Sequence, residues 1–137
     1  MRVTLTRTHG AQYLGKNEAG RTLTMSGSPD IGPSEAGVRP MEAVLLALAG
    51  CSAVDVQLIL QKGRHTLTDL EVTVDGTRAD AVPAVFTEIH LHFEAAGDFP
   101  EQKLERAVAL SHEKYCSVAR MLEPDVKITT SFAKREG

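Results

Sequence analysis

The feature that most constrains this chain is an apolar segment near its middle. Proline suits the first turn of a helix and Gly63 suits its C-terminal end, so we predict a helix from about Pro40 to Lys62. Apolar residues fall on almost every side of this segment, which is typical of a helix buried all round. At a rise of 1.5 Å per residue it would be roughly 35 Å long, enough to cross a domain or a dimer interface.

Length, charge and hydropathy exclude several classes of protein. The uncharged apolar run, residues 43–54, is shorter than the ~20 residues that span a bilayer, and the N-terminus lacks the apolar core of a signal peptide. A net charge of -3 without a basic stripe argues against nucleic-acid binding. We therefore expect one cytoplasmic domain, residues 1–137, with no membrane or nucleic-acid partner.

The segments around the helix alternate polar and apolar residues as strands do. The first 27 residues predict a small antiparallel sheet of two or three strands, followed by a Gly-, Pro- and Ser-rich connection at residues 26–39. Later strands are predicted at residues 70–74, 87–95 and 126–132, with helices from an N-cap at Asp98 and over residues 116–122. The order β-β-β-α-β-β-α-α-β, without βαβ regularity, predicts an α+β fold.

The first of two cysteines, Cys51, lies near the middle of the predicted helix. An apolar setting raises a thiol pKa, and Asp55 one turn further on would raise it again by like-charge repulsion. A reactive Cys51 therefore needs a cation from elsewhere in the fold, and Arg21 and Arg39 are candidates. Without such a cation, the cysteines are inert apolar residues.

The second cysteine, Cys116, has two possible settings. If its helix is continuous, His112 and Arg120 lie one turn away on the same face and would lower the thiol pKa. If the helix breaks at residues 113–115, those contacts vanish. Local sequence alone thus favours Cys116 as the more acidic thiol, provided that the helix continues.

Four polar residues alternate along one predicted strand: Glu88, His90, His92 and Glu94. A His-x-His pair can bind metal, but on an alternating strand it is more typical of a solvated face, and no third ligand has motif spacing. We therefore predict no metal site. The sequence also lacks a phosphate-binding loop and the motifs of serine hydrolases and zinc proteases.

Two segments resemble the OsmC/Ohr family, most closely its YhfA-like branch: residues 39–55 (RPMEAVLLALAGCSAVD) and 111–118 (SHEKYCSV). In that family a Pro-Glu or Pro-Met-Glu segment opens the central helix, a cysteine follows about three turns later, and a later helix provides a second cysteine. The resemblance implies an OsmC-like fold with small antiparallel sheets around a long buried central helix. It also implies an intertwined homodimer with two sites at the subunit interface.

The resemblance further implies a peroxiredoxin-like role in the oxidative stress response. Cys51 would attack an organic hydroperoxide and Cys116 would resolve the sulfenic acid, with a dithiol or a lipoylated protein as reductant and no cofactor. The other implied site residues are Arg21 and Glu42, which would hold the thiolate and position the peroxide, and Met41, Leu48 and Arg39, which would contact substrate. The resemblance thus favours Cys51, not Cys116, as the attacking thiol.

Two alternatives to the peroxidase stay open. The same dimer could bind an apolar small molecule while its thiols stay inert, or it could be a thiol-based stress sensor with slow turnover. One departure bears on the choice. The Ohr pattern has glutamate directly after the proline, where this chain has Met41. Glu42 is one residue further on, and one helical step is ~100° of rotation, so its carboxylate would lie on a different side of the helix.

Overall fold

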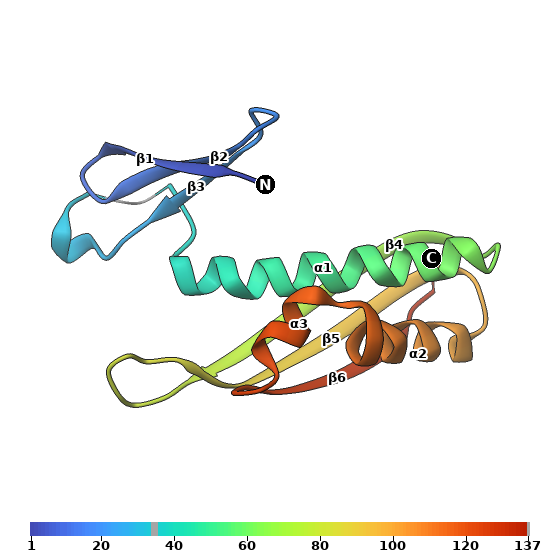
Figure 1. The fold of residues 1–137 in the computed structure, drawn as a ribbon. Coiled ribbons are helices and arrows are strands. Elements are labelled where there is room, and N and C mark those ends of the chain that lie inside the picture. Colours follow the sequence, from blue (N-terminus) through green and yellow to red (C-terminus); the bar gives the residue numbers. More distant parts are fainter. Residues whose placement is uncertain (34–35, 137) are drawn as a thin grey trace. The chain divides into compact units, whose positions relative to one another are not determined.

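The computed structural model describes residues 1–33 and 36–136 (Figure 1). Its contacts divide the chain into two compact units, Met1–Val44 and Leu45–Gly137. The expected α+β class is confirmed, with two small sheets and a long helix. Whether the chain is one domain stays a prediction.

The N-terminal unit is built on a three-stranded antiparallel sheet in the order β1 (Val3–His9), β2 (Gln12–Asn17) and β3 (Thr22–Ser26). This confirms the sheet predicted for the first 27 residues. Gly10 turns the chain between β1 and β2 with a φ of 52°, and a Cβ there would lie 2.5 Å from the carbonyl oxygen of Pro33. Glycine is therefore required at this turn, both for its backbone conformation and for space.

The predicted connection after β3 is tied to the sheet where it is described; residues 34–35 lie outside the described part. A short 3-10 helix, η1 (Pro29–Ile31), is followed by a parallel bridge between Val38 and Met25. The backbone N–H of Gly37 also donates a hydrogen bond to the buried Ser26 hydroxyl, at 2.9 Å. These contacts fix the chain just before the long helix.

Helix α1 spans Pro40–Lys62, as predicted. Its first turn is closed by Glu42, whose Oε1 accepts a 2.8 Å hydrogen bond from the backbone N–H of Arg39, while the Arg39 carbonyl accepts from the N–H of Ala43. This is the carboxylate half of a capping box, in which the third helical residue reaches back to the residue before the helix. The sequence R-P-M-E thus starts the helix by its own local hydrogen bonds.

Burial along α1 differs from the prediction of a helix buried all round. Its fully buried residues recur every fourth position and form one stripe: Leu48, Ser52, Val56 and Leu60. Other apolar side chains of α1 are 47–65% exposed: Leu46, Val54 and Leu58. The prediction was wrong for the single chain because only one side of α1 packs against its own unit.

The uncharged apolar run at residues 43–54 also underestimates the length of apolar helix in the structure. By length and composition α1 could cross a bilayer, with an 18-residue window of mean hydropathy 2.1, of which 22% is buried. The uncharged run ends at residue 54 because Asp55 carries a charge, but one isolated charge does not interrupt the apolar window of the helix. A core helix of a globular protein has the same character, and the buried stripe assigns α1 that role.

The C-terminal unit contains the second sheet, in the order β4 (Thr66–Arg78), β5 (Phe86–Asp98) and β6 (Lys127–Lys134). Strands β4 and β5 are antiparallel, whereas β5 and β6 are parallel. The parallel pair is joined by α2 (Glu101–Leu110), a π-helical turn η2 (Ser111–Tyr115) and α3 (Ser117–Leu122). The predicted second short helix after residue 116 is therefore present.

One predicted boundary was wrong. Asp98 does not cap α2; it is the last residue of β5, paired with Thr66, and the helix begins three residues later with Pro100 at its N-cap and no side-chain cap. The β4–β5 ladder extends beyond the alternating residues that predicted it, because backbone pairing continues through residues whose side chains give no strand signal.

The two faces of the second sheet differ as the alternation predicted. Ile89, Leu91, Phe93 and Ala95 of β5 are at most 1% exposed, and α1 and the α2–α3 segment lie together on one side of the sheet (Figure 1). On the other face, His90 and His92 both contact the Ser131 hydroxyl of β6, at 2.8 and 2.6 Å. The histidines thus form hydrogen bonds between neighbouring strands on the polar face.

Candidate thiol site

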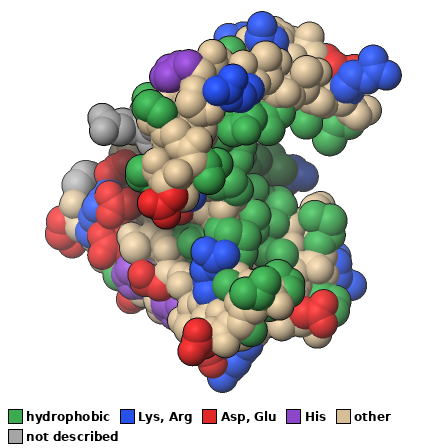
Figure 2. Space-filling model, turned by 90° about the vertical axis from the view of Figure 1, so that its left-hand side faces the viewer, with side chains coloured by type: hydrophobic (Ala, Val, Ile, Leu, Met, Phe, Trp, Pro, Cys, Tyr) green, Lys and Arg blue, Asp and Glu red, His purple; other side chains and the backbone are tan. Residues whose placement is uncertain are grey.

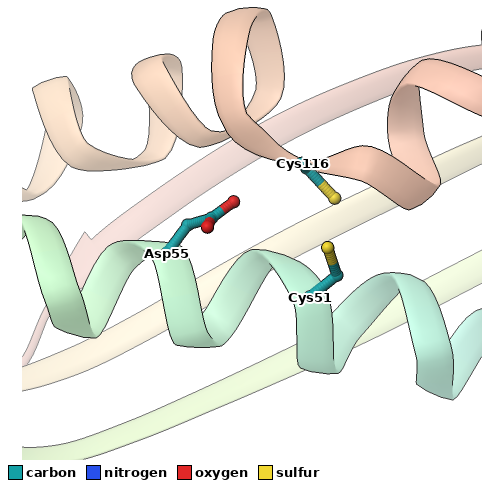
Figure 3. A group of neighbouring side chains, drawn as sticks. All are labelled: Cys51, Asp55 and Cys116. Carbon is teal, nitrogen blue, oxygen red and sulfur yellow. The ribbon is translucent and has the colours of Figure 1, made fainter. Parts of the chain in front are cut away.

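The first thiol projects from the middle of a regular helix. Cys51 lies three turns into α1, next to the buried stripe at Ser52, and is half-buried. Asp55 follows one turn later, and the side chains of both residues lie on the same side of α1 (Figure 3). Helical spacing alone places this thiol and this carboxylate together.

The second thiol sits at a break between two helices. Helix α2 ends at Leu110, and the N–H of Cys116 donates to the Ser111 carbonyl at 2.8 Å, which closes the π-helical turn η2. Cys116 has an extended backbone and caps α3, where its Sγ accepts a hydrogen bond from the N–H of Ala119 at 3.4 Å. Of the two alternatives left open by the sequence, the broken helix is the one observed.

This break removes the cations that a continuous helix would have placed beside Cys116. The His112 ring instead lies 3.6 Å from a carboxylate oxygen of Glu123, and Arg120 is exposed. The expectation of a lowered pKa for Cys116 was wrong. Burial raises the pKa of this thiol above 9.0 and the proximity of Cys51 adds to the rise, which hydrogen bonds from Ser52 and Ala119 only partly offset.

Helix α1 and the N-cap of α3 bring three ionisable side chains together. The sulfur atoms of Cys51 and Cys116 and a carboxylate oxygen of Asp55 all lie within 4.8 Å of one another (Figure 3). Two serine hydroxyls support them: Ser52 donates to Cys116 Sγ at 3.5 Å, and Ser111 donates to Asp55 Oδ2 at 3.0 Å. The structure thus brings the two predicted cysteines close together, with their sulfur atoms within 4.8 Å of each other.

Two serines of this site were not predicted from the sequence. Ser52 follows Cys51 in the buried stripe, and Ser111 precedes Cys116 by five residues, a spacing that brings it close only through the π-helical turn. The sequence predicts Asp55 only as a charge that would raise the pKa of Cys51. An i, i+4 search from Cys51 finds the carboxylate, but no regular spacing finds Ser111.

The other predicted site residues are placed as follows. Leu48 is fully buried on α1, whereas Met41 and Arg39 are half-buried and Glu42 and Arg21 are exposed in the N-terminal unit. The carboxylate of Glu42 is engaged in the helix cap described above, which gives it a structural role. The catalytic and substrate-binding roles of these five residues stay predictions.

Arg21 directly precedes β3, and its backbone N–H donates to Asn17 Oδ1 at 2.9 Å. Arg21 lines a hollow of about 510 Å³ together with Leu23 and Met25 of β3, and Val3 and Leu5 line the same hollow. Hydrophobic side chains are visible at the surface of both units (Figure 2). The N-terminal unit therefore presents an apolar surface with a guanidinium group at it.

The structure is thus an α+β chain in which a long helix places one cysteine close to a second cysteine that caps another helix. The family is shown by sequence: the model of the OsmC-like protein family matches residues 32–131, and this chain belongs to that family. It is also 48% identical over 125 residues to Protein YhfA of Escherichia coli, with 90% of each chain covered. The resemblance to the YhfA-like branch is confirmed.

Solved structures agree with this assignment. A hypothetical protein from Aquifex aeolicus is 34% identical with a TM-score of 0.85, and the match covers 99% of this chain and 96% of that one. An organic hydroperoxide resistance protein OsmC from Legionella pneumophila has a TM-score of 0.70 at 16% identity, with 97% of each chain covered. At that identity the second match shows the shared fold.

Proposed function

We propose that this protein is a thiol-dependent peroxidase that reduces organic hydroperoxides. The observation that carries the proposal is the approach of Cys51 and Cys116 to within 4.8 Å on two different helical segments. Membership of the OsmC-like family and the hydroperoxide resistance of the Legionella protein with this fold supply the substrate class.

The reaction would follow the order of the two thiols. The Cys51 thiolate attacks the outer peroxide oxygen, which breaks the O–O bond, leaves a sulfenic acid on Cys51, and releases an alcohol after protonation. Cys116 then displaces water from the sulfenic acid and forms the disulfide. A dithiol, free or on a lipoylated protein, reduces the disulfide and is itself oxidised.

The raised pKa of Cys116 fits the second role. A thiol that keeps its proton at neutral pH does not compete for the hydroperoxide, since only the thiolate is a good nucleophile. Cys51 is the more accessible of the two, half-buried where Cys116 is 3% exposed. The raised pKa of Cys116 and the greater accessibility of Cys51 both support Cys51 as the attacking thiol.

The attacking thiolate needs a positive partner. Among residues 45–136 no hydrogen bond or ion pair joins either thiol to a lysine or arginine. We propose Arg21 as this partner, in a homodimer that also covers the exposed apolar side chains of α1. Arg21→Lys would then slow oxidation of Cys51 less than Arg21→Ala, because lysine keeps the charge but not the planar fork.

The test follows both thiols in the fully reduced, chelator-treated protein after one equivalent of cumene hydroperoxide. We expect loss of two free thiols and two hydrogens by intact mass, with no reaction in Cys51→Ser. Cys116→Ser should instead trap a sulfenic acid on Cys51. Survival of both thiols in excess hydroperoxide would refute the peroxidase.

The apolar hollow of the N-terminal unit supports a second candidate, a dimeric module that binds an apolar small molecule. Binding of a fluorescent fatty acid that survives Cys51→Ser, with thiols that ignore hydroperoxide, would favour this function. Oxidation without rapid recycling by dihydrolipoamide would instead favour a stress sensor.

A further inference from the structure

We infer that the reduced site binds a zinc-like divalent transition-metal ion through Cys51, Asp55 and Cys116. The inference uses the thiols of the proposed peroxidase but does not rest on that reaction. It starts from an arrangement that a peroxidase does not require: a carboxylate within 4.8 Å of both sulfurs. A like charge at this distance disfavours a thiolate, whereas a metal ion would be stabilised by all three groups.

The spacing of the donor atoms suits such an ion. Tetrahedral zinc, with bonds of about 2.3 Å to sulfur and 2.0 Å to oxygen, holds its ligands about 3.5–3.8 Å apart. The three donor atoms here are all within 4.8 Å of one another, so small side-chain rotations would complete the geometry. Figure 3 shows Cys51 and Asp55 on α1 and Cys116 facing them from the start of α3. Three protein ligands leave a fourth position open for water.

The hydrogen bonds around the donors also match a metal site. Cys116 Sγ accepts from the Ser52 hydroxyl and the Ala119 N–H, and Asp55 Oδ2 accepts from the Ser111 hydroxyl. Groups that donate to metal ligands orient them and stabilise their negative charge. Asp55 keeps its second carboxylate oxygen for an ion, and within residues 45–136 no lysine or arginine forms an ion pair with it.

Two thiolates and one carboxylate carry three negative charges, which a divalent ion would reduce to one. Binding must release the thiol protons, so the affinity should rise with pH. Thiolate ligands favour zinc and similar ions over calcium or magnesium. The ligand set thus selects a soft or borderline ion.

Metal binding and oxidation would exclude each other. When the hydroperoxide takes two electrons from the two thiolates and two protons from the solution, the products are the disulfide, an alcohol and one water molecule. The ion then loses two of its three ligands. Zinc would therefore protect the thiols from hydroperoxide, and oxidation would release zinc.

The test uses Co²⁺ as the spectroscopic probe, added to the reduced full-length protein without oxygen or hydroperoxide. We expect a thiolate-to-cobalt charge-transfer band that saturates at one ion per chain and disappears when Zn²⁺ is added. The band should be lost in Cys51→Ser and in Cys116→Ser. Asp55→Asn keeps both thiols and should weaken binding on the order of tenfold or more.

The matched control is His92→Gln, because His90 and His92 carry metal-ligating nitrogens but lie on the polar strand face, where both contact the Ser131 hydroxyl. Its charge-transfer band and affinity should be unchanged. Wild-type affinity in Asp55→Asn, absence of the band, or loss of binding in His92→Gln alone would each overturn the inference. Circular dichroism of every variant separates lost binding from lost folding. Thiol oxidation is measured separately with chelator present, so the metal site and the peroxidase can fail independently.

Discussion

The two cysteines of the site come from backbones of opposite character. Cys51 projects from the middle of α1, a regular helix whose ends are set by local sequence signals. Cys116 lies where α2 gives way to a π-helical turn and a new helix, α3, begins. The first thiol is half-buried; the second is almost fully buried and receives two hydrogen bonds at its sulfur. The difference teaches that a regular helix leaves one thiol accessible, whereas an irregular turn buries the other and surrounds its sulfur with hydrogen-bond donors.

The largest expected effect tests that division of labour. Cys51→Ser should abolish hydroperoxide consumption, whereas Cys116→Ser should still consume one equivalent, because only the resolving step is lost. Stopped-flow measurement of hydroperoxide loss at one equivalent distinguishes the two variants. Equal residual activity would mean that the thiols are interchangeable and that their different settings have no functional meaning.

The sequence predicted one side of this comparison better than the other. The bounds of α1 followed from Pro40, Gly63 and unbroken apolar character, because helix start and stop signals are local. The sequence leaves the break at Cys116 open, since no proline or glycine marks the π-helical turn at Ser111–Tyr115. Helical spacing therefore predicts His112 and Arg120 beside Cys116, whereas the break in the helix places them elsewhere.

Burial was the other limit on prediction from sequence. Composition predicts that α1 is buried on every side, but the chain itself fully buries only the stripe of Leu48, Ser52, Val56 and Leu60. Hydropathy reports the preference of a surface for burial, and it does not say whether the same chain or a second copy provides the cover. The same limit kept the roles of Arg21 and Glu42 as predictions.

The second largest effect concerns the two sides of α1. Leu48→Ala should lower the free energy of unfolding by about 2–5 kcal/mol, because it leaves a cavity in the core, whereas Leu46→Ala, at a 54% exposed position, should cost far less in a monomer. Urea unfolding at low and high protein concentration measures both. A large cost for Leu46→Ala that depends on concentration would show that a second copy covers this side.

A smaller effect is expected in the pH dependence of stability. Because the pKa of Cys116 is raised in the folded state, its contribution to stability is present below the unfolded thiol pKa near 9.0 and is lost as the pH rises through the higher folded value. The free energy of unfolding should therefore fall above about pH 9. Denaturant titrations of the reduced protein and of Cys116→Ser measure it, and the variant should show a flatter alkaline limb.

The smallest effect isolates the hydrogen bond from Ser52 of α1 to the sulfur of Cys116. Ser52→Ala removes the hydroxyl that donates to Cys116 Sγ, so the pKa of this thiol should rise further, since a donor to the sulfur stabilises the thiolate. In a Cys51→Ser background, the pH profile of Cys116 alkylation should shift upward by less than about one unit, as expected for a single neutral hydrogen bond. Ser117→Ala, at an exposed position next to the same thiol, is the matched control and should leave the profile unchanged. A downward shift in Ser52→Ala would mean that the serine excludes water from Cys116 more than it stabilises the thiolate, and that burial alone keeps this thiol protonated.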